Sequence, residues 1–181
     1  MRWESLFEDL EAQIEADDRA ARASEIVERT RAERATLTLL DRLLAHVGQQ
    51  LAWQLVDGDM LPGQLLDVGA DWVMVESGGE CLVPLHAVAA VSGLSRMAEP
   101  GQQPVRRLGL GVVLRGLSRD RSAVVVRIRG GRLVRGTLDR VGVDHVDLAV
   151  HAADEVRRAA SVAAVQTVPF PAVISIRRAG R

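Results

Sequence analysis

Arginine side chains gather in one short stretch of this sequence, where they could bind anions. Arg127, Arg129, Arg132 and Arg135 fall within residues 123–141, which alternate like a strand, a turn and a second strand. Side chains alternate between the two faces of a strand, so Arg127 and Arg129 should point outward together, with the other two on the adjoining hairpin. A guanidinium is always charged and binds phosphate or carboxylate through a planar fork of N–H donors. The stretch could therefore bind nucleic acid or an acidic protein surface, or form a solvated strand face.

Other residue types that could do chemistry show no spacing that indicates an active site. Gly109-Leu110-Gly111 lacks the third glycine of a dinucleotide turn, and a chain without Lys has no phosphate loop of the usual kind. The histidines have no paired metal-ligand spacing: they are His46, His86, His145 and His151. We expect no catalytic residues, no metal, no cofactor and no small-molecule substrate.

Composition is typical of a cytoplasmic protein. The chain has 181 residues, of which 48% are hydrophobic and 26% charged, and its apolar runs are too short to cross a bilayer. Its N-terminus leads into an acidic amphipathic stretch, so no signal peptide is visible. The single cysteine, Cys81, excludes an internal disulfide and fits a small core thiol. We expect a cytoplasmic protein without membrane contact.

An internal repeat defines the elements that must position these residues. The stretch Gly63–Val73 returns as Gly136–Val146, 73 residues later, and the register continues upstream without a gap. Trp53 falls on Val126 in this alignment, which predicts equivalent core positions. A repeat of this kind indicates that one structural unit occurs twice.

The first residues predict an acidic helical arm over residues 1–36. Apolar residues recur there at spacings of three and four, which places them on one stripe of a helix. They are Trp3, Leu6, Phe7, Leu10 and Ile14. This stripe would be buried either against the rest of the chain or against another protein, and we expect a protein partner or self-association through it.

Two units of similar pattern follow the arm. A short helix at 38–47 precedes alternating strands at about 50–57, 60–68, 71–76, 80–84 and 88–93. A less regular helix at 107–117 precedes strands at about 123–129, 132–141, 144–150, 156–160 and 162–168, with a further edge strand at 172–176. Val88–Val91 and Val162–Val165 would be the same closing strand in the two units. We therefore divide the chain into an arm (1–36), a first unit (37–98), a linker (99–104) and a second unit (105–181).

Charge differs sharply between the two units. Residues 48–98 carry one Arg against six acidic residues, whereas residues 99–181 carry 15 Arg against seven. Residues 1–47 carry seven Arg against 11 acidic residues. Such a split indicates an anionic partner for the second unit, or attraction between oppositely charged parts of the chain or of its copies.

The second unit resembles Sm-like (Lsm/Hfq-type) small barrels. Residues 124–138 have an alternating strand, a Gly-Gly turn and a Gly-Thr-Leu strand, and residues 144–148 add an Asp and a hydrophobic-Asp step where the family has its base-contacting Asn. As a whole the chain also resembles tandem-repeat proteins of GC-rich, actinobacterial-type bacteria. The resemblance implies a bent five-stranded barrel behind a helix.

These observations predict an α+β chain: an N-terminal helical arm followed by two tandem helix-plus-five-strand barrels of the Sm-like or SH3-like type. Its expected function is that of a non-catalytic interaction or adaptor protein. The alternative is a protein that binds RNA or another nucleic acid weakly through the basic face of the second barrel. Arg127, Arg129, Arg132 and Arg135 would make the phosphate contacts.

Overall fold

The computed structural model describes residues 35–99, 108–150 and 164–179. The chain divides into two compact units, Met1–Thr38 and Leu39–Arg181, and the fold described below is that of the second. The predicted helical arm, with Trp3, Leu6, Phe7, Leu10 and Ile14, lies outside the described residues. So does the strand expected at 156–160.

Within Leu39–Arg181 we call residues 39–99 the first half and residues 108–179 the second half. The described residues of the first half form one α-helix, one short 3₁₀ helix and five strands. They are α2 (Leu39–Leu44), β1 (Gln50–Leu55), β2 (Met60–Val68), β3 (Trp72–Glu76), β4 (Glu80–Pro84), η1 (Leu85–Ala87) and β5 (Val88–Ser92). Glycines with positive φ occupy the two hairpin turns, at Gly58 and at Gly78 and Gly79, as their sequence context predicts.

The second half repeats this order of elements. They are α3 (Leu110–Asp120), β6 (Ala123–Ile128), β7 (Leu133–Val141), β8 (His145–Val150), β9 (Ala164–Pro169), η4 (Phe170–Ala172) and β10 (Val173–Arg178). The 73-residue offset holds for the first two strands of each half, since β1 begins at residue 50 and β6 at 123, and β2 spans 60–68 and β7 133–141. The predicted repeat is confirmed for these strands.

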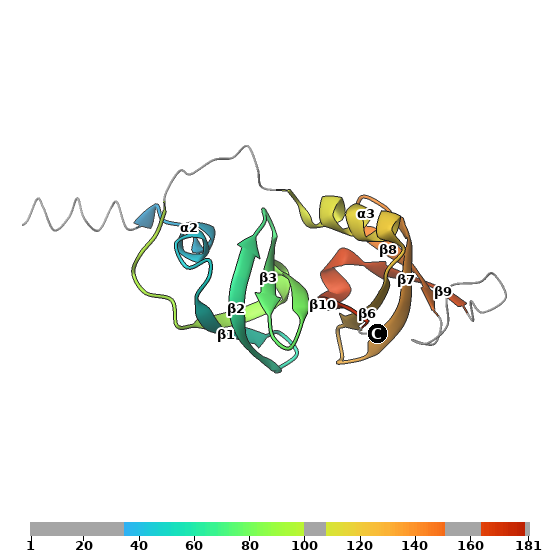
Figure 1. The fold of residues 1–181 in the computed structure, drawn as a ribbon, viewed down its shortest axis with the longest axis horizontal. Helices are drawn as coiled ribbons and strands as arrows, with labels where there is room; N and C mark the ends of the chain where they lie inside the picture. The colour runs from blue at the N-terminus through green and yellow to red at the C-terminus, as the bar shows by residue number, and fades with distance from the viewer. Residues whose placement is uncertain (1–34, 100–107, 151–163, 180–181) are drawn as a thin grey trace, which may run out of the picture. The chain divides into compact units, whose positions relative to one another are not determined.

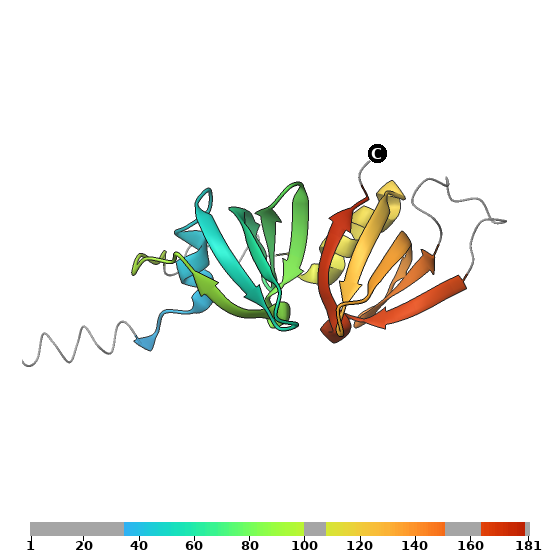
Figure 2. The same cartoon turned by 90° about the horizontal axis from the view of Figure 1, so that it is seen from below.

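The prediction of two separate five-stranded barrels is wrong. All ten strands form one open antiparallel sheet in the order β5-β1-β2-β3-β4-β10-β6-β7-β8-β9. The two halves join where β4 pairs with β10, at Leu82 with Ile176 and Cys81 with Arg177. Figure 1 shows β10 between the strands of the first half and β6, and Figure 2 shows it, in red, beside the green strands. The arrangement escaped sequence analysis because backbone pairing between two edges leaves no pattern in side chains.

The closing strand of the second half was also assigned to the wrong residues. In the first half, Pro84 is followed by η1 and then by β5, which starts at residue 88; in the second half, Pro169 is followed by η4 and then by β10, which starts at residue 173. The equivalent of Val88 is therefore Val173, 85 residues later, and not Val162. The segment that appeared to be an extra edge strand is thus the fifth strand of the repeat, and it lies inside the sheet.

Two hydrophobic cores lie along this sheet, and each half supplies residues to both. Trp53 is buried in the first core and Val126 in the second, as the repeat predicted. However, Ile174 from β10 belongs to the first core, whereas Trp72 and Leu82 from β3 and β4 belong to the second. Neither half therefore completes its core alone.

The repeated glycines permit close contacts between neighbouring strands. A Cβ atom on Gly63 would lie 2.3 Å from the carbonyl oxygen of Glu76, and one on Gly136 would lie 2.2 Å from that of Ala149. Both strands also carry a register shift shortly after this glycine, between Leu65 and Asp67 in β2 and at the matching place in β7. In each half, the second strand therefore combines a close approach to its neighbour at a glycine with a bulge shortly after it.

Candidate anion-binding site

The four arginines predicted from sequence do not point to one place. Arg127, from β6, and Arg135, from β7, line a common cavity. Arg129 donates from Nε to the carbonyl oxygen of Pro171 at 2.9 Å, and Arg132 donates from Nη2 to Oε1 of Gln166 at 3.4 Å. Neither Arg129 nor Arg132 lines the cavity. Arg129 and Arg132 lie outside β6 and β7, in the turn on either side of Gly130 and Gly131, whereas Arg127 and Arg135 lie within the strands.

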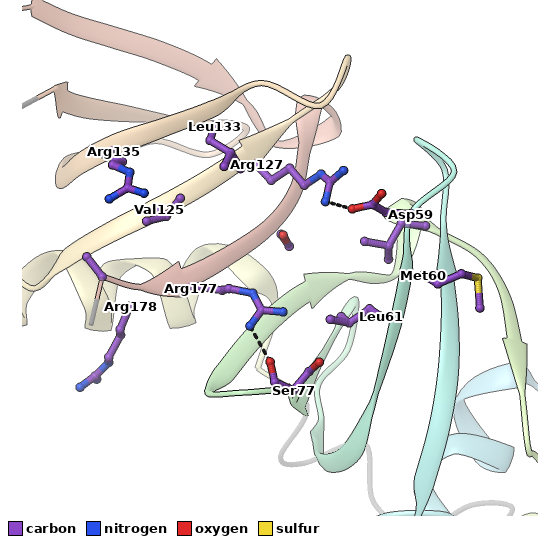
Figure 3. A pocket seen from close by; sticks show the side chains of 13 residues that line it. Asp59, Met60, Leu61, Ser77, Val125, Arg127, Leu133, Arg135, Arg177 and Arg178 are labelled. Atoms are coloured by element: carbon purple, nitrogen blue, oxygen red, sulfur yellow. Dashed lines mark hydrogen bonds and ion pairs between the residues drawn. The ribbon is translucent and has the colours of Figure 1, made fainter. Parts of the chain in front are cut away.

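The cavity, about 480 Å³ in volume, lies where the β1–β2 hairpin of the first half faces β6, β7 and β10 of the second. We call it the arginine groove, and Figure 3 shows its lining side chains. Its polar members are Asp59, Ser77, Arg127, Arg135, Ser175, Arg177 and Arg178, and its apolar members are Leu55, Met60, Leu61, Val125, Leu133 and Ala179. This volume falls within the usual range of ligand pockets, roughly 300–1,000 Å³.

Arg127 is neutralised by acidic residues of the first half. Its Nε lies 2.7 Å from Oδ2 of Asp57, whose side chain is nearly buried, and its Nη1 is paired with Oδ2 of Asp59. The hydrogen bond to Asp59 is the main reason why the pKa of Arg127 is raised further above its ordinary value. The contact with Asp57 lacks the alignment of a hydrogen bond and is an electrostatic pair. Arg127 therefore holds the two halves together and is not available to an incoming anion.

Arg135 and Arg177 are the cations that remain for a ligand. Cross-strand pairing places Val125 opposite Arg135 on one side and opposite Arg177 on the other, so the three form one row across the sheet. Neighbouring strands are about 4.8 Å apart, so the two arginine backbones are separated by about 10 Å. Arg177 donates from Nη1 to the carbonyl oxygen of Ser77 at 2.8 Å. Among the described residues, neither guanidinium has a carboxylate partner.

Two apolar side chains are exposed at the mouth of the groove, together with charged ones such as Asp59 and Arg135. Met60, the first residue of β2, and Leu133, the first residue of β7, occupy equivalent positions in the two halves, and both are more than half exposed. Arg178, farther along β10, forms a longer and exposed ion pair with Asp120, with Nη2 3.5 Å from Oδ2. A ligand could therefore combine a negative group over Val125 with an apolar group at the mouth.

Cys81 lies beneath the groove, beside Ser175 and Arg177. Burial raises the pKa of its thiol, and the nearby charge of Arg177 and the hydrogen bonds from both neighbours oppose that rise without cancelling it. Burial thus favours the protonated thiol, and the buried position of Cys81 agrees with the core role expected of it.

Sequence analysis missed Arg177 and Arg178 as members of the site. Val173, Ser175 and Arg177 alternate as in a strand, which is a signal for an outward-facing Arg177. The sequence, however, predicted an edge strand there and gave no reason to place it next to residues 124–138. Their contribution depends on the pairing of β10 with both β4 and β6. Asp147, where the Sm-like family has its base-contacting Asn, accepts a hydrogen bond from Oγ1 of Thr167 at 2.6 Å and does not line the groove.

The histidines within the described ranges make structural contacts. His46 is buried and its Nδ1 lies 2.6 Å from the carbonyl oxygen of Arg42, while its Nε2 accepts from the backbone N–H of Ser95 at 2.9 Å. His86 Nε2 donates to the carbonyl oxygen of Val173 at 3.0 Å. In the described part of the chain, no three His, Cys, Asp or Glu side chains come together as a metal site would require.

Comparison with protein-family models finds no match to this sequence, and comparison with curated proteins finds none either. The resemblance to Sm-like proteins therefore stays a prediction. None of the helices in the described ranges has the length and apolar character needed to span a membrane.

Proposed function

We propose that this chain is a non-catalytic interaction protein, and that its arginine groove binds an acidic segment of a partner protein. The observation that supports this proposal is the row of Arg177, Val125 and Arg135, in which two arginines lack carboxylate partners among the described residues. Arginine is strongly represented among the residues that contribute most to protein interfaces, because it combines charge, a planar donor fork and an apolar stem.

The rest of the groove favours a protein segment over a simple anion. Exposed Met60 and Leu133 at the mouth offer apolar contact area, and methionine adapts its shape to different partners. The hydroxyls of Ser77 and Ser175 also line the groove, and a hydroxyl can hydrogen-bond to the polar backbone of a peptide. An acidic residue followed by an apolar one would satisfy both parts of the groove.

The test is a crosslinked pull-down with the full chain, divided into nuclease-treated and untreated halves. We expect a protein partner that is captured in both halves. Arg135→Glu should abolish capture, because it reverses a charge that lines the groove and has no ion-pair partner among the described residues. Arg132→Glu is the matched control, since it makes the same charge change outside the groove and should leave capture intact. Equal loss with both variants would mean that general positive charge, and not the groove, recruits the partner.

Nucleic acid is the second candidate for this surface, and the same two uncompensated arginines favour it. Of the arginines that line the groove, Arg127 and Arg178 are paired with carboxylates, and Arg135 and Arg177 have none among the described residues, so these two remain to contact phosphates there. Each phosphate contact with a single strand contributes a salt slope of about 0.7, so two contacts predict a slope of about −1.4, where the four arginines expected from sequence would give about −3.

Titration of labelled oligouridylate against the full chain at several salt concentrations measures this slope. Few aromatic residues are present to stack bases, with no Tyr in the chain, so base preference should be slight. Binding that is tight, insensitive to salt and unchanged by Arg135→Glu would place any nucleic-acid site elsewhere. The partner or self-association predicted for residues 1–36 stays a separate prediction.

A further inference from the structure

A loop of the first half holds the beginning of helix α3. The loop is Gly69–Trp72, between β2 and β3. The carbonyl oxygen of Leu108 accepts from the backbone N–H of Ala70 at 3.2 Å and from the indole Nε1 of Trp72 at 2.8 Å. Oδ1 of Asp71 accepts from the backbone N–H of Leu110 at 2.7 Å. Since Gly109 provides no side-chain cap of its own, Asp71 caps the helix from another part of the chain.

The equivalent loop of the second half, Gly142–His145, has the same backbone geometry. In the first loop the N–H of Gly69 donates to the carbonyl of Trp72 at 2.8 Å; in the second, Gly142 donates to His145 at 2.9 Å. Each aspartate carbonyl also accepts from the residue after the fourth strand, Leu85 to Asp71 at 2.8 Å and Phe170 to Asp144 at 2.7 Å. The ring of His145 lies over Gly142 as the ring of Trp72 lies over Gly69.

Among the described residues, no helix begins against this second loop as α3 begins against the first. Leu110, at the start of α3, is 2% exposed and Trp72 is 6% exposed, because each packs in the second core. In contrast, Val143 is 95% exposed, and the side chains of Asp144 and His145 are 85% and 39% exposed. Asp144 Oδ1 lies 2.8 Å from His145 Nδ1, and this hydrogen bond lowers the pKa of the Asp144 carboxyl. The loop therefore presents a charged acceptor and an apolar side chain to solvent.

We propose that the Gly142–His145 loop is a receptor for the amino-terminal end of an α-helix of a partner protein. It offers counterparts of two groups that hold α3: a backbone donor at Val143, in the place of Ala70, and a carboxylate at Asp144, in the place of Asp71. His145 replaces Trp72, and its Nδ1 is hydrogen-bonded to Asp144. The carboxylate can cap a helix start, because the first N–H groups of a helix have no partners within the helix and carry partial positive charge. The Val143 N–H can donate to the carbonyl oxygen of the residue before the cap, as Ala70 donates to that of Leu108. The fitting helix has a short capping residue and a large apolar residue at its first position, as Gly109 and Leu110 provide in α3.

This site is separate from the arginine groove, since none of Gly142–His145 lines it. The partner helix supplies apolar contact to Val143, which otherwise exposes nearly its entire side chain to water. Binding would direct the Asp144 carboxylate toward the helix N–H groups, with the other carboxylate oxygen still able to meet His145. Loss of one site should therefore leave the other intact.

The test uses a synthetic peptide that reproduces the known occupant of the first loop, residues 107–121 of this chain with an acetylated N-terminus. We titrate it into the isotope-labelled full chain and follow backbone amide signals by NMR. Saturable shifts should appear at Val143, Asp144 and His145. Asp144→Ala should weaken binding about fivefold, the factor that corresponds to loss of a typical helix cap. Asp147→Asn, which removes the same charge from neighbouring strand β8, should change affinity less than twofold.

Three results would overturn the proposal. Shifts confined to Ala70–Trp72 would mean that the peptide competes with α3 for the first loop. Equal weakening by Asp144→Ala and Asp147→Asn would reduce the effect to general charge attraction. A change in the mass of the full chain in solution on Val143→Asp would show that a second copy, and not a partner protein, covers the loop. A peptide with Leu110→Asp should not bind, which checks the apolar contact independently of the variants in the chain.

Discussion

Trp53 and His46 show two ways in which a polar side-chain atom is buried in the first half, one without a hydrogen-bond partner and one with partners. Trp53 is completely buried, and its indole Nε1 has no hydrogen-bond partner within the described residues. His46 is equally buried, but both of its ring nitrogens have partners. A buried polar group without a partner costs stability, whereas a paired one contributes about 1 kcal/mol. The contribution of Trp53 must therefore come from the packing of its ring.

Replacement of Trp53 separates these two effects. Trp53→Ala should lower the free energy of unfolding by about 3–5 kcal/mol, since it leaves a large cavity in the first core. Trp53→Phe should cost much less, because it keeps most of the ring and removes the unpaired N–H. Urea unfolding followed by far-UV circular dichroism measures both. Equal costs for the two variants would show that the indole N–H is satisfied in solution.

Cys81 should make the free energy of unfolding fall as the pH becomes alkaline. Its folded-state pKa is raised by burial, so the folded chain keeps the proton while the unfolded chain releases it near the ordinary thiol pKa of about 8.5. This contribution is fully present below the unfolded pKa and is lost as pH rises toward the folded pKa. Cys81→Ala should flatten that part of the stability profile, measured by urea unfolding at several pH values. A profile identical to that of the wild type would mean that other groups cause the alkaline loss.

At the level of elements, the two free edges of the sheet differ from the pair that joins the halves. The joining strands β4 and β10 contribute Leu82, Ile174 and Ile176, all buried. The strands that occupy the equivalent places at the ends of the sheet, β5 and β9, carry smaller or more polar residues there, with Ala89 for Ile174 and Thr167 for Leu82. An edge with little apolar area gains little from pairing. The described outer edges at β5 and β9 therefore gain less from pairing with a further strand than β4 and β10 gain from pairing with each other.

The close approach of β7 and β8 predicts a large effect of a small substitution. Gly136→Ala would place a methyl group 2.2 Å from the carbonyl oxygen of Ala149, so the strands must separate. We expect a loss of about 1–3 kcal/mol, as for other overpacked sites. Gly116→Ala, in helix α3 with no atom within 4 Å, is the control and should raise stability by up to about 1 kcal/mol. Thermal unfolding of the two variants checks the signs, which must be opposite.

For the unit as a whole, the exchange of residues between cores couples its two halves. The second core contains Trp72 and Leu82 from the first half, and the first core contains Ile174 from the second. The ion pairs of Arg127 with Asp57 and Asp59 cross the same junction. A substitution that destabilises one half should therefore destabilise the other, and Leu39–Arg181 should unfold as one cooperative system.

Truncation tests this coupling. A fragment of residues 105–181 lacks β3 and β4, so its core loses Trp72 and Leu82 and exposes apolar side chains that these two residues help to bury in the full chain. We expect the fragment to lack a cooperative unfolding transition, while the full chain shows a single transition by circular dichroism and by tryptophan fluorescence. Leu82→Ala in the full chain should cost about 2–5 kcal/mol without splitting that transition. A stable fragment with a sharp transition would mean that the second half folds independently.

The sequence by itself determined the repeat, the faces of most strands and the glycine turns, because these depend on local alternation and on backbone conformations that neighbouring residues impose. Trp53 and Val126 could be assigned to equivalent core positions for the same reason. The tertiary structure alone decided that β10 pairs with β4 as well as β6, since hydrogen bonds between strand edges use backbone groups common to every residue. That pairing brings the first half against β6, so that Arg127 meets Asp57 and Asp59 and Arg177 lines the same groove as Arg135. It also places α3 against the Gly69–Trp72 loop, a contact between distant segments that no local pattern encodes.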